Sequence, residues 1–238
     1  MNTSEINNSY SSVYAAAVIL AAGSAVRFGS DKIMLDLCGR PVICRAAEVF
    51  LSLPFFKEIV MVVPENKIDF YKNLFSSADN ISVVPGGRSR AESSVLGLRA
   101  VSSRAEYIAI HDADRPLLST ALVCAVMEAA ARYGAAAPAV EPFDTIKKVT
   151  GPGFVAETLP RETLRAVQTP QIFRAELIRA AAERAFSEGF AGTDDCSLAE
   201  HYGEKVFLVP GERDNIKITV SRDLELARLI YTQREADK

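Results

Sequence analysis

Residue types that build metal centres and disulfides are scarce in this sequence. The four cysteines show no C-x-x-C spacing, and the two histidines fall in no metal-ligand pattern. Neither a zinc site nor a disulfide framework is therefore indicated, and reduced thiols in a cytoplasmic protein are the expected state. The residues concerned are Cys38, Cys44, Cys124, Cys196, His111 and His201.

An excess of positive charge is also absent. The 238 residues carry a formal net charge of -3 at pH 7. A general nucleic-acid-binding protein relies on a basic face, so nucleic acid is disfavoured as a partner. Any cationic binding site in this chain must therefore be local.

Targeting and membrane-spanning patterns are lacking too. Residues 1–12 contain Glu5 but no Lys or Arg, so they lack the positive region of a secretory signal, and we expect residues 1–13 to form a disordered tail. The apolar run at residues 15–22 is far too short to cross a bilayer. The length and the 49% hydrophobic content predict one soluble globular domain over residues 14–238, with no membrane partner.

Apolar, β-rich runs alternate with longer amphipathic runs along the rest of the chain. This alternation is typical of an α/β fold in which crossover helices connect the strands of a mostly parallel sheet. We expect strands at residues 16–20, 58–63, 82–84, 107–110, 135–140 and 206–209. We expect helices at residues 42–51, 67–74, 91–101, 120–132, 175–188, 194–202 and 222–232.

One segment interrupts this alternation. Residues 141–168 are rich in proline and glycine around strand-like pieces such as 145–149. We expect a β-arm at about 142–168 that protrudes from the sheet. Because such an arm has little core of its own, it is expected to pack against a second subunit of a homodimer.

The loop after the first expected strand has the composition of a polyphosphate site. Ala21, Ala22 and Gly23 let backbone N–H groups approach an anionic ligand, and Arg27 and Lys32 can bind phosphate oxygens. The spacings G-x-x-x-x-G-K-S/T and G-x-G-x-x-G are both absent, which disfavours a P-loop hydrolase and a dehydrogenase. The alternative is an ordinary connection between a strand and a helix, with two surface cations.

A second candidate loop follows the expected strand at residues 82–84. Ligands of parallel α/β sheets bind at the carboxyl ends of the strands, where this loop would lie. Gly86 and Gly87 allow close backbone approach, and Ser93 is expected to open a helix. A glycine turn followed by a helix cap is the alternative.

A third loop carries the pattern His-Asp-x-x-Arg-Pro at residues 111–116. Asp112 is expected where the sheet edge meets solvent, and its carboxylate suits a ribose hydroxyl or Mg²⁺. Arg115 is expected either to hold Asp112 and Asp114 or to reach a phosphate, and a charged turn stopped by proline is the alternative. By strand alternation Lys217 points away from its two isoleucine neighbours, toward a site that calls for an anion.

Together these motifs resemble the 2-C-methyl-D-erythritol 4-phosphate cytidylyltransferases of the non-mevalonate isoprenoid pathway. The resemblance extends from Tyr14 to the C-terminal helix. It implies a Rossmann-like nucleotidyltransferase fold and transfer of CMP from CTP to 2-C-methyl-D-erythritol 4-phosphate, with release of pyrophosphate. The motifs are Leu20-Ala21-Ala22-Gly23 with Arg27 and Lys32, Gly86-Gly87 with Arg90 and Ser93, residues 111–116, Asp144-Thr145, Thr169-Pro170-Gln171-x-Phe173, Thr193-Asp194 and Asp214-Asn215-Ile216-Lys217.

The resemblance also implies a role for individual residues. Arg27 and Lys32 would hold the triphosphate and stabilise the charge that develops at the α-phosphorus. Asp112 would lie near the ribose or near a divalent cation such as Mg²⁺, which the triphosphate would mainly hold. The CTP-binding residues would be Ala21, Ala22, Gly23, Gly87, Arg88, Ser93, Asp112 and Ala113. The residues that bind the polyol phosphate would be Arg115, Thr145, Arg161, Thr169, Thr193 and Lys217. In a homodimer, Thr145 and Arg161 on the expected arm could reach the partner's site.

Two positions depart from the family pattern. Asp31-Lys32-Ile33 stands where the family commonly has Pro-Lys-Gln, and Asp114 stands where a small residue is usual. A carboxylate beside a triphosphate repels it unless the carboxylate is paired or bridged by a cation. The alternative functions are a ribitol 5-phosphate or other polyol phosphate cytidylyltransferase, which shares most of these motifs, and a non-catalytic nucleotide-binding homologue.

Overall fold

The central feature of the fold is a mixed, mostly parallel β-sheet. The computed structural model describes residues 10, 12–22, 31–190 and 192–236. Within these residues eight strands form one sheet in the order β10-β7-β11-β6-β1-β4-β5, with β12 paired to β7. The four strands β5, β4, β1 and β6 run parallel to one another. They are Ile81–Pro85, Phe56–Val63, Ala15–Leu20 and Tyr107–Asp112.

The other half of the sheet contains antiparallel strands. Strand β11 (Gln171–Arg174) lies between β6 and β7 (Ala135–Val140) and is antiparallel to both. Strand β10 (Ala166–Val167) is antiparallel to β7, and β12 (Phe207–Pro210) is parallel to it. The predicted fold class is therefore confirmed, although β10 and β11 were not among the expected strands.

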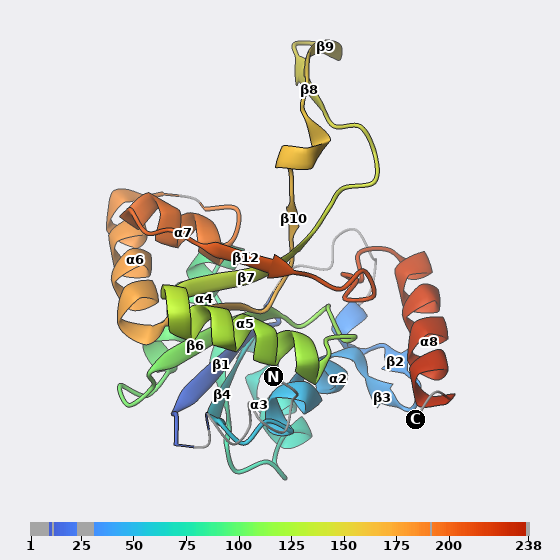
Figure 1. Cartoon of the computed structure of the whole chain (residues 1–238). Helices are drawn as coiled ribbons and strands as arrows, with labels where there is room; N and C mark the ends of the chain where they lie inside the picture. Colours follow the sequence, from blue (N-terminus) through green and yellow to red (C-terminus); the bar gives the residue numbers. More distant parts are fainter. Residues whose placement is uncertain (1–9, 11, 23–30, 191, 237–238) are drawn as a thin grey trace.

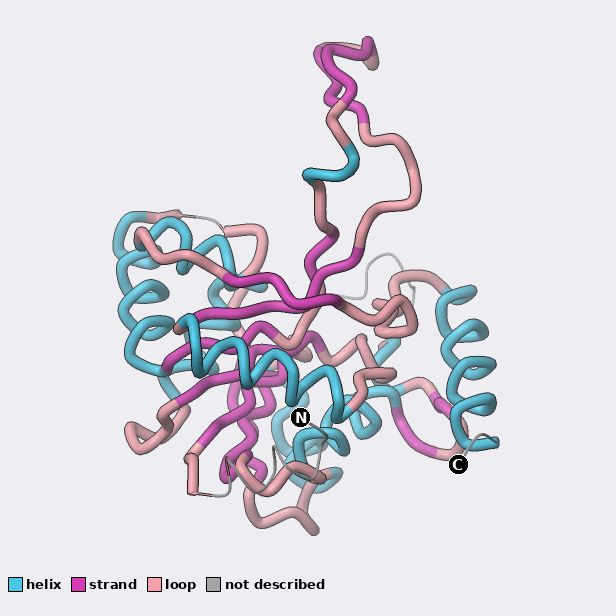
Figure 2. Tube along the Cα trace, viewed as in Figure 1, coloured by secondary structure: helices cyan, strands magenta, loops and turns pink. Residues whose placement is uncertain are grey.

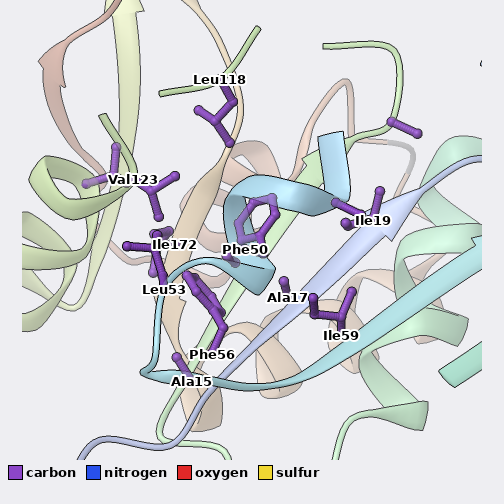
Figure 3. Packing of buried hydrophobic residues seen from close by; sticks show 14 of the residues in the cluster. Ala15, Ala17, Ile19, Phe50, Leu53, Phe56, Ile59, Leu118, Val123 and Ile172 are labelled. Carbon is purple, nitrogen blue, oxygen red and sulfur yellow. The ribbon is translucent and has the colours of Figure 1, made fainter. Parts of the chain in front are cut away.

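Strand β1 shows why the sheet forms at its observed place. All six of its residues are buried, as expected for a parallel strand that is covered on both faces. Successive side chains point to opposite faces, so Ala15, Ala17 and Ile19 enter one core cluster, whereas Ala16 and Val18 enter another. Figure 3 shows Ala15, Ala17 and Ile19 in the first cluster with Phe50 and Ile59.

Helices cover both faces of the sheet (Figure 1). Buried side chains place α2, α3 and α5 on the face of the first cluster and α4, α6 and α7 on the face of the second. On the first face the helices are Val42–Leu51, Ile68–Leu74 and Thr120–Tyr133, and on the second they are Arg90–Ala100, Ala175–Glu188 and Asp195–Tyr202. The expected helices are thus present, with small shifts at their ends.

The last helix, α8 (Ser221–Ala236), packs apart from the two main clusters. Leu224 and Ala227 of this helix join a small buried cluster with Leu37 and Ile218. Leu37 belongs to a short hairpin that was not expected from the sequence, formed by β2 (Asp36–Leu37) and β3 (Arg40–Pro41). The described residues also contain three short 3-10 helices: Lys32–Met34, Glu65–Lys67 and Arg161–Thr163.

A hairpin extends away from the body of the molecule (Figures 1 and 2). It consists of β8 (Lys147–Thr150) and β9 (Phe154–Thr158), which form a separate two-stranded sheet. All residues of both strands are exposed, including Phe154 at 74% and Val155 at 59%. The segment therefore has no hydrophobic core of its own. In the described part of the chain, no helix is long and apolar enough to cross a membrane.

Candidate active site

A cleft of about 550 Å³ opens where the parallel strands of the sheet end. Its walls come from the residues after β1, from the loop between β5 and α4, from the end of β6 and from the segment before α8. The cleft lies at the carboxyl ends of the strands, where a ligand site is expected. The described lining residues are Leu20, Ala21, Ala22, Asp31, Lys32, Ile33, Gly87, Arg88, Ser89, Arg90, Ser93, Asp112, Asp114 and Lys217.

One wall of the cleft is built from closely packed backbone. The N–H of Gly86 donates to the carbonyl oxygen of Val63 at 2.8 Å. A Cβ atom at position 86 would lie 2.2 Å from Cβ of Ala22, so only glycine lets these two loops approach so closely. The two loops therefore form one continuous backbone wall, and the predicted approach of this backbone to an anionic ligand stays a prediction.

Ser93 holds this glycine loop in shape. Its hydroxyl accepts a hydrogen bond from the N–H of Gly87 at 3.1 Å and donates to the carbonyl oxygen of Ser89 at 2.8 Å. The prediction that Ser93 opens the helix was wrong, because Ser89 is the N-cap of α4 and its hydroxyl accepts from the N–H of Glu92. Arg88 lies in the same loop, but its side chain is 97% exposed to solvent.

Asp112 forms the charged floor of the cleft. It ends β6 and lines the cleft, as expected for the edge of the sheet, but only 7% of its surface is exposed. Its Oδ1 accepts from Nε and Nη2 of Arg90 at 3.1 and 3.0 Å, and its Oδ2 accepts from Nζ of Lys217 at 2.7 Å. Burial raises the pKa of Asp112, but Arg90 and Lys217 outweigh burial and hold that pKa well below its usual value. Asp112 is therefore ionised at neutral pH.

Asp114 is paired rather than left to repel a ligand. Its Oδ2 accepts from Nζ of Lys32 at 2.5 Å, and its Oδ1 lies 3.8 Å from Nζ of Lys217. Lys32 also donates to the carbonyl oxygen of Ile218 at 2.8 Å. The neighbouring Asp31 is bound by Lys67 at 2.6 Å, so it does not draw Lys32 away from the cleft.

Six charged side chains thus alternate in sign across the site. At one end, Asp195 at the start of α7 lies 2.9 Å from Arg90. At the other end, Asp114 pairs with Lys32. Asp195 is fully buried and accepts from the hydroxyl of Ser94 at 2.5 Å, which ties α7 to α4. Burial raises the pKa of Asp195 and outweighs the nearby Arg90, which acts to lower that pKa. The series is Asp195, Arg90, Asp112, Lys217, Asp114 and Lys32.

Arg115 does not hold the two carboxylates, so that option was wrong. Its Nη1 donates to the carbonyl oxygen of Asn215 at 2.7 Å, and the carboxylates of Asp112 and Asp114 are bound by the other cations. Burial is the main cause that lowers the pKa of Arg115. Arg115 therefore acts from behind the cleft, where it fixes the segment that carries Lys217.

His111 and Thr169 lie beneath the floor of the cleft. The hydroxyl of Thr169 accepts from the N–H of Asp112 at 3.2 Å and lies 2.9 Å from Nδ1 of His111. Nε2 of His111 lies 3.1 Å from the carbonyl oxygen of Arg115, so Nε2 carries the proton and Nδ1 accepts from Thr169. Burial lowers the pKa of His111 to about 4, which keeps the ring neutral at pH 7.

Several predicted residues are not brought to the cleft. Ala113 is fully buried, and Thr169 is 4% exposed, so neither side chain lines the cleft in the described structure. Thr193 is exposed just before α7, outside the described lining. Thr145 and Arg161 lie in the segment that carries the protruding hairpin, where Nη1 of Arg161 donates to the carbonyl oxygen of Phe143 at 2.7 Å. Two further predicted residues, Gly23 and Arg27, lie outside the described residues.

Arg90 and Asp195 were not predicted as site residues. Arg90 lines the cleft and binds the carboxylates of Asp112 and Asp195. These carboxylates stabilise the charged guanidinium more than burial destabilises it, so the pKa of Arg90 is raised. One signal in the sequence pointed to Arg90: it is the second arginine after Gly86-Gly87, and it belongs to the family motif quoted for that loop. Its partners could not be read from the sequence, because they lie 22 and 105 residues away.

Comparison with known proteins identifies the family and agrees with the fold. The profile of the 2-C-methyl-D-erythritol 4-phosphate cytidylyltransferase family matches residues 15–233. A protein of that name from Endomicrobium trichonymphae is 41% identical over 221 residues, which cover 90% of this chain and 97% of the relative. One from Geobacillus thermodenitrificans is 41% identical over 226 residues, which cover 93% and 98%.

A solved structure supports the same assignment. The crystal structure of 4-diphosphocytidyl-2C-methyl-D-erythritol synthase from Anaerococcus prevotii aligns with a TM-score of 0.83 and 31% sequence identity. The alignment covers 92% of this chain and 99% of that one. With the profile match and the two relatives, it confirms the predicted resemblance: the chain belongs to the 2-C-methyl-D-erythritol 4-phosphate cytidylyltransferase family, whose members are nucleotidyltransferases.

Proposed function

We propose that this chain transfers the cytidylyl group of CTP to 2-C-methyl-D-erythritol 4-phosphate. The observation that carries the proposal is the cleft itself, in which Lys32, Arg90 and Lys217 converge on two buried carboxylates at the ends of parallel strands. A site with these cations suits two phosphate groups that repel each other and must be brought together. The names of the relatives favour methylerythritol phosphate over ribitol 5-phosphate as acceptor.

The reaction needs positioning more than proton transfer. An oxygen of the acceptor phosphate attacks the α-phosphorus of CTP, a new P–O bond forms, and the bond from that phosphorus to the bridging oxygen breaks to release pyrophosphate. The acceptor phosphate is already an anion at neutral pH, so no strong general base is required. The neutral, buried His111 fits this view, since it holds Thr169 and the Arg115 backbone rather than facing the cleft.

The nucleotide half of the site is assigned to the glycine wall and the floor. Backbone at Ala21, Ala22 and Gly87 would approach the base and phosphates, with Ser93 fixing the turn at Gly87. Asp112 would accept from a ribose hydroxyl. Lys32, with Arg27 from the preceding loop, would stabilise the negative charge that develops on the transferred phosphoryl group. Gly23, Arg88 and Ala113 complete the proposed CTP contacts, Ala113 through its backbone only.

The carboxylates of the cleft fit a magnesium ion that enters with the nucleotide. Among the described residues, no cluster of three or more acidic, histidine or cysteine side chains could cage a metal. Mg²⁺ commonly takes one or two carboxylates together with substrate phosphates and water, and Asp112 at the floor of the cleft offers one such carboxylate. When bound, the ion would neutralise part of the triphosphate charge.

The acceptor half of the site is assigned to Lys217 and to residues of the protruding segment. Lys217 lies across Asp112 and Asp114 from Lys32, where it could bind the acceptor phosphate. Thr145 and Arg161 would come from the second subunit of a homodimer, and Thr193 would approach from the start of α7. Thr169 and Arg115 would act indirectly, since they hold the backbone around Asp112 and Asn215.

Pyrophosphate release tests the proposal directly. The purified protein is assayed with CTP, ATP, GTP and UTP, each with methylerythritol phosphate and with ribitol 5-phosphate. We expect release with CTP and methylerythritol phosphate to exceed every other combination. Faster release with ribitol 5-phosphate would reassign the acceptor, and CTP binding without release in any mixture would identify a non-catalytic homologue.

A further inference from the structure

The cation assigned to the triphosphate, Lys32, already has two partners within the protein. Its ammonium group has three donors. One hydrogen bond reaches Oδ2 of Asp114 at 2.5 Å, and another reaches the carbonyl oxygen of Ile218 at 2.8 Å. A phosphate that engages Lys32 fully must therefore displace Asp114 or share the ammonium group with it.

Asp114 is held firmly in this position. It is only 9% exposed, and its backbone carbonyl oxygen accepts from the N–H of Ile218 at 2.8 Å. Its other carboxylate oxygen, Oδ1, is buried without a hydrogen-bond partner and lies 3.8 Å from Nζ of Lys217. The carboxylate thus lies between the two cations assigned to the two phosphates.

Asp114 is also not needed to organise the rest of the charge series. Asp112 is bound on both oxygens by Arg90 and Lys217, and Arg90 is bound by Asp195. Without the Asp114 charge, Lys217 would keep Asp112, and Lys32 would keep the carbonyl oxygen of Ile218. The main electrostatic effect of Asp114 is therefore to offset positive charge that an anionic ligand would otherwise meet.

We propose that Asp114 is a specificity-determining residue that competes with polyphosphate for Lys32 and, more weakly, for Lys217. This inference rests on the proposed function, because it takes Lys32 as a phosphate-binding cation. The competition lowers affinity for every phosphate ligand. Only ligands with enough negative charge displace the Asp114 carboxylate and bind well. The competition therefore favours a triphosphate over a monophosphate.

The test measures affinity rather than turnover. Calorimetric titration gives the Kd of CTP, CMP and inorganic pyrophosphate for the wild type, Asp114→Asn and Asp114→Ala, each with Mg²⁺ and with a chelator. Because the ion pair is partly buried and of moderate strength, both variants should bind CTP and pyrophosphate roughly five- to tenfold more tightly in both media. CMP should gain at least as much, so that the preference for CTP over CMP narrows.

Two controls separate competition from a general change of charge. Asp31→Asn removes a carboxylate that lines the cleft but is bound by Lys67, so it should change the Kd less than Asp114→Asn does. In a Lys32→Met background most of the gain from Asp114→Asn should disappear, because the contested cation is gone. Thermal unfolding confirms that each variant is folded, and Asn keeps the shape of the original side chain.

The outcomes distinguish the inference from the proposed function. Unchanged or weaker binding of pyrophosphate by Asp114→Asn overturns the inference, and so does a loss seen only with Mg²⁺, which would make Asp114 a metal ligand. A wild-type protein that binds pyrophosphate but not CTP contradicts the proposed function. In that case the Kd of pyrophosphate for the wild type and for Asp114→Asn still tests the role of Asp114. Tighter binding of both probes that depends on Lys32 supports the competition.

Discussion

Lys32 is the described residue on which transfer should depend most. Loss of a cation that stabilises charge on a transferred phosphoryl group commonly lowers turnover by roughly two to four orders of magnitude. We expect this loss of kcat for Lys32→Ala, measured as steady-state pyrophosphate release at saturating substrates, and a similar loss for Arg27→Ala. Lys72→Ala, which removes an exposed lysine of α3 outside the described lining of the cleft, is a matched control. A turnover number like that of the wild type would remove the proposed role of Lys32.

Lys217 should matter mainly for the acceptor. Its side chain is 37% exposed, lines the cleft and places its ammonium group beside Asp112 and Asp114, so a phosphate can reach it from the cleft. Lys217→Ala should raise the KM for methylerythritol phosphate by about tenfold or more, because the variant loses a charge-assisted contact to the acceptor phosphate. The KM for CTP, measured in the same experiment, should rise less. A normal KM for the acceptor would argue against this assignment.

His111 should make the protein lose stability in mild acid. The unfolded chain binds a proton at His111 below about pH 6.5, whereas burial in the folded protein lowers that pKa to about 4. Between these values the unfolded state binds more protons, so the free energy of unfolding falls as the pH falls, by up to about 3 kcal/mol. Asp112 adds a separate loss at lower pH, since its pKa is also depressed on folding.

Urea unfolding between pH 7 and pH 4.5 checks this expectation. His111→Gln keeps a polar side chain that can hydrogen-bond but does not titrate, so the slope of stability against pH should flatten. His201→Gln changes a partly exposed histidine of α7 and serves as the control. An equally steep slope in His111→Gln would show that another group causes the acid sensitivity.

At the scale of elements, α4 packs very closely on the sheet at Gly97. A Cβ atom at Gly97 would lie 2.4 Å from Cγ1 of Val18 and 2.8 Å from Cγ2 of Val62. Gly97→Ala gains helix propensity, but overpacking of this kind destabilises by about 1–3 kcal/mol, so the net effect should be a lower Tm. The double variant Gly97→Ala with Val18→Ala should regain part of the loss, and a Tm above that of the wild type in the single variant would contradict this view.

The elements also differ in how readily they could be predicted. Helices such as α2 and α6 were found because their apolar residues recur with helical spacing over ten or more positions. Strand β11 was missed because it has only four residues, among them Gln171 and Arg174, and takes extended form through its ladders with β6 and β7. The hairpin of β2 and β3 was missed for the same reason, since each strand has two residues.

At the scale of the whole molecule, the protruding hairpin is the part that calls for a partner. Phe143 and Phe154 are 71% and 74% exposed, and a two-stranded hairpin is marginally stable alone. We expect a homodimer in which each protruding segment contacts the other subunit. Replacing residues 144–163 by a short glycine-serine linker should therefore give a monomer in sedimentation experiments, and a dimer after this change would contradict the assignment.

Mixed dimers test whether the partner contributes to the site. Arg161→Ala should mainly weaken binding of the acceptor, so at an acceptor concentration well below the KM of that variant, Arg161→Ala and Lys32→Ala should each be nearly inactive. A mixture allowed to exchange subunits should regain activity at the same concentration. One site of each mixed dimer would then contain an intact Lys32 and an intact Arg161 from the other chain, which is about one quarter of all sites after random exchange. If Arg161 served the site of its own chain, mixing would restore nothing.

The sequence by itself determined the α/β class, the main strands and helices, and the loops that carry Lys32, Gly87, Asp112 and Lys217. These features depend on local periodicity and on motifs of a few adjacent residues. Only the tertiary structure decided which charges meet: Lys32 with Asp114 rather than Asp31, and Asp112 with Arg90 and Lys217 rather than Arg115. Such pairs join residues far apart in the chain, and the sheet, by setting the positions of its strand ends, brings them within a few ångströms of each other.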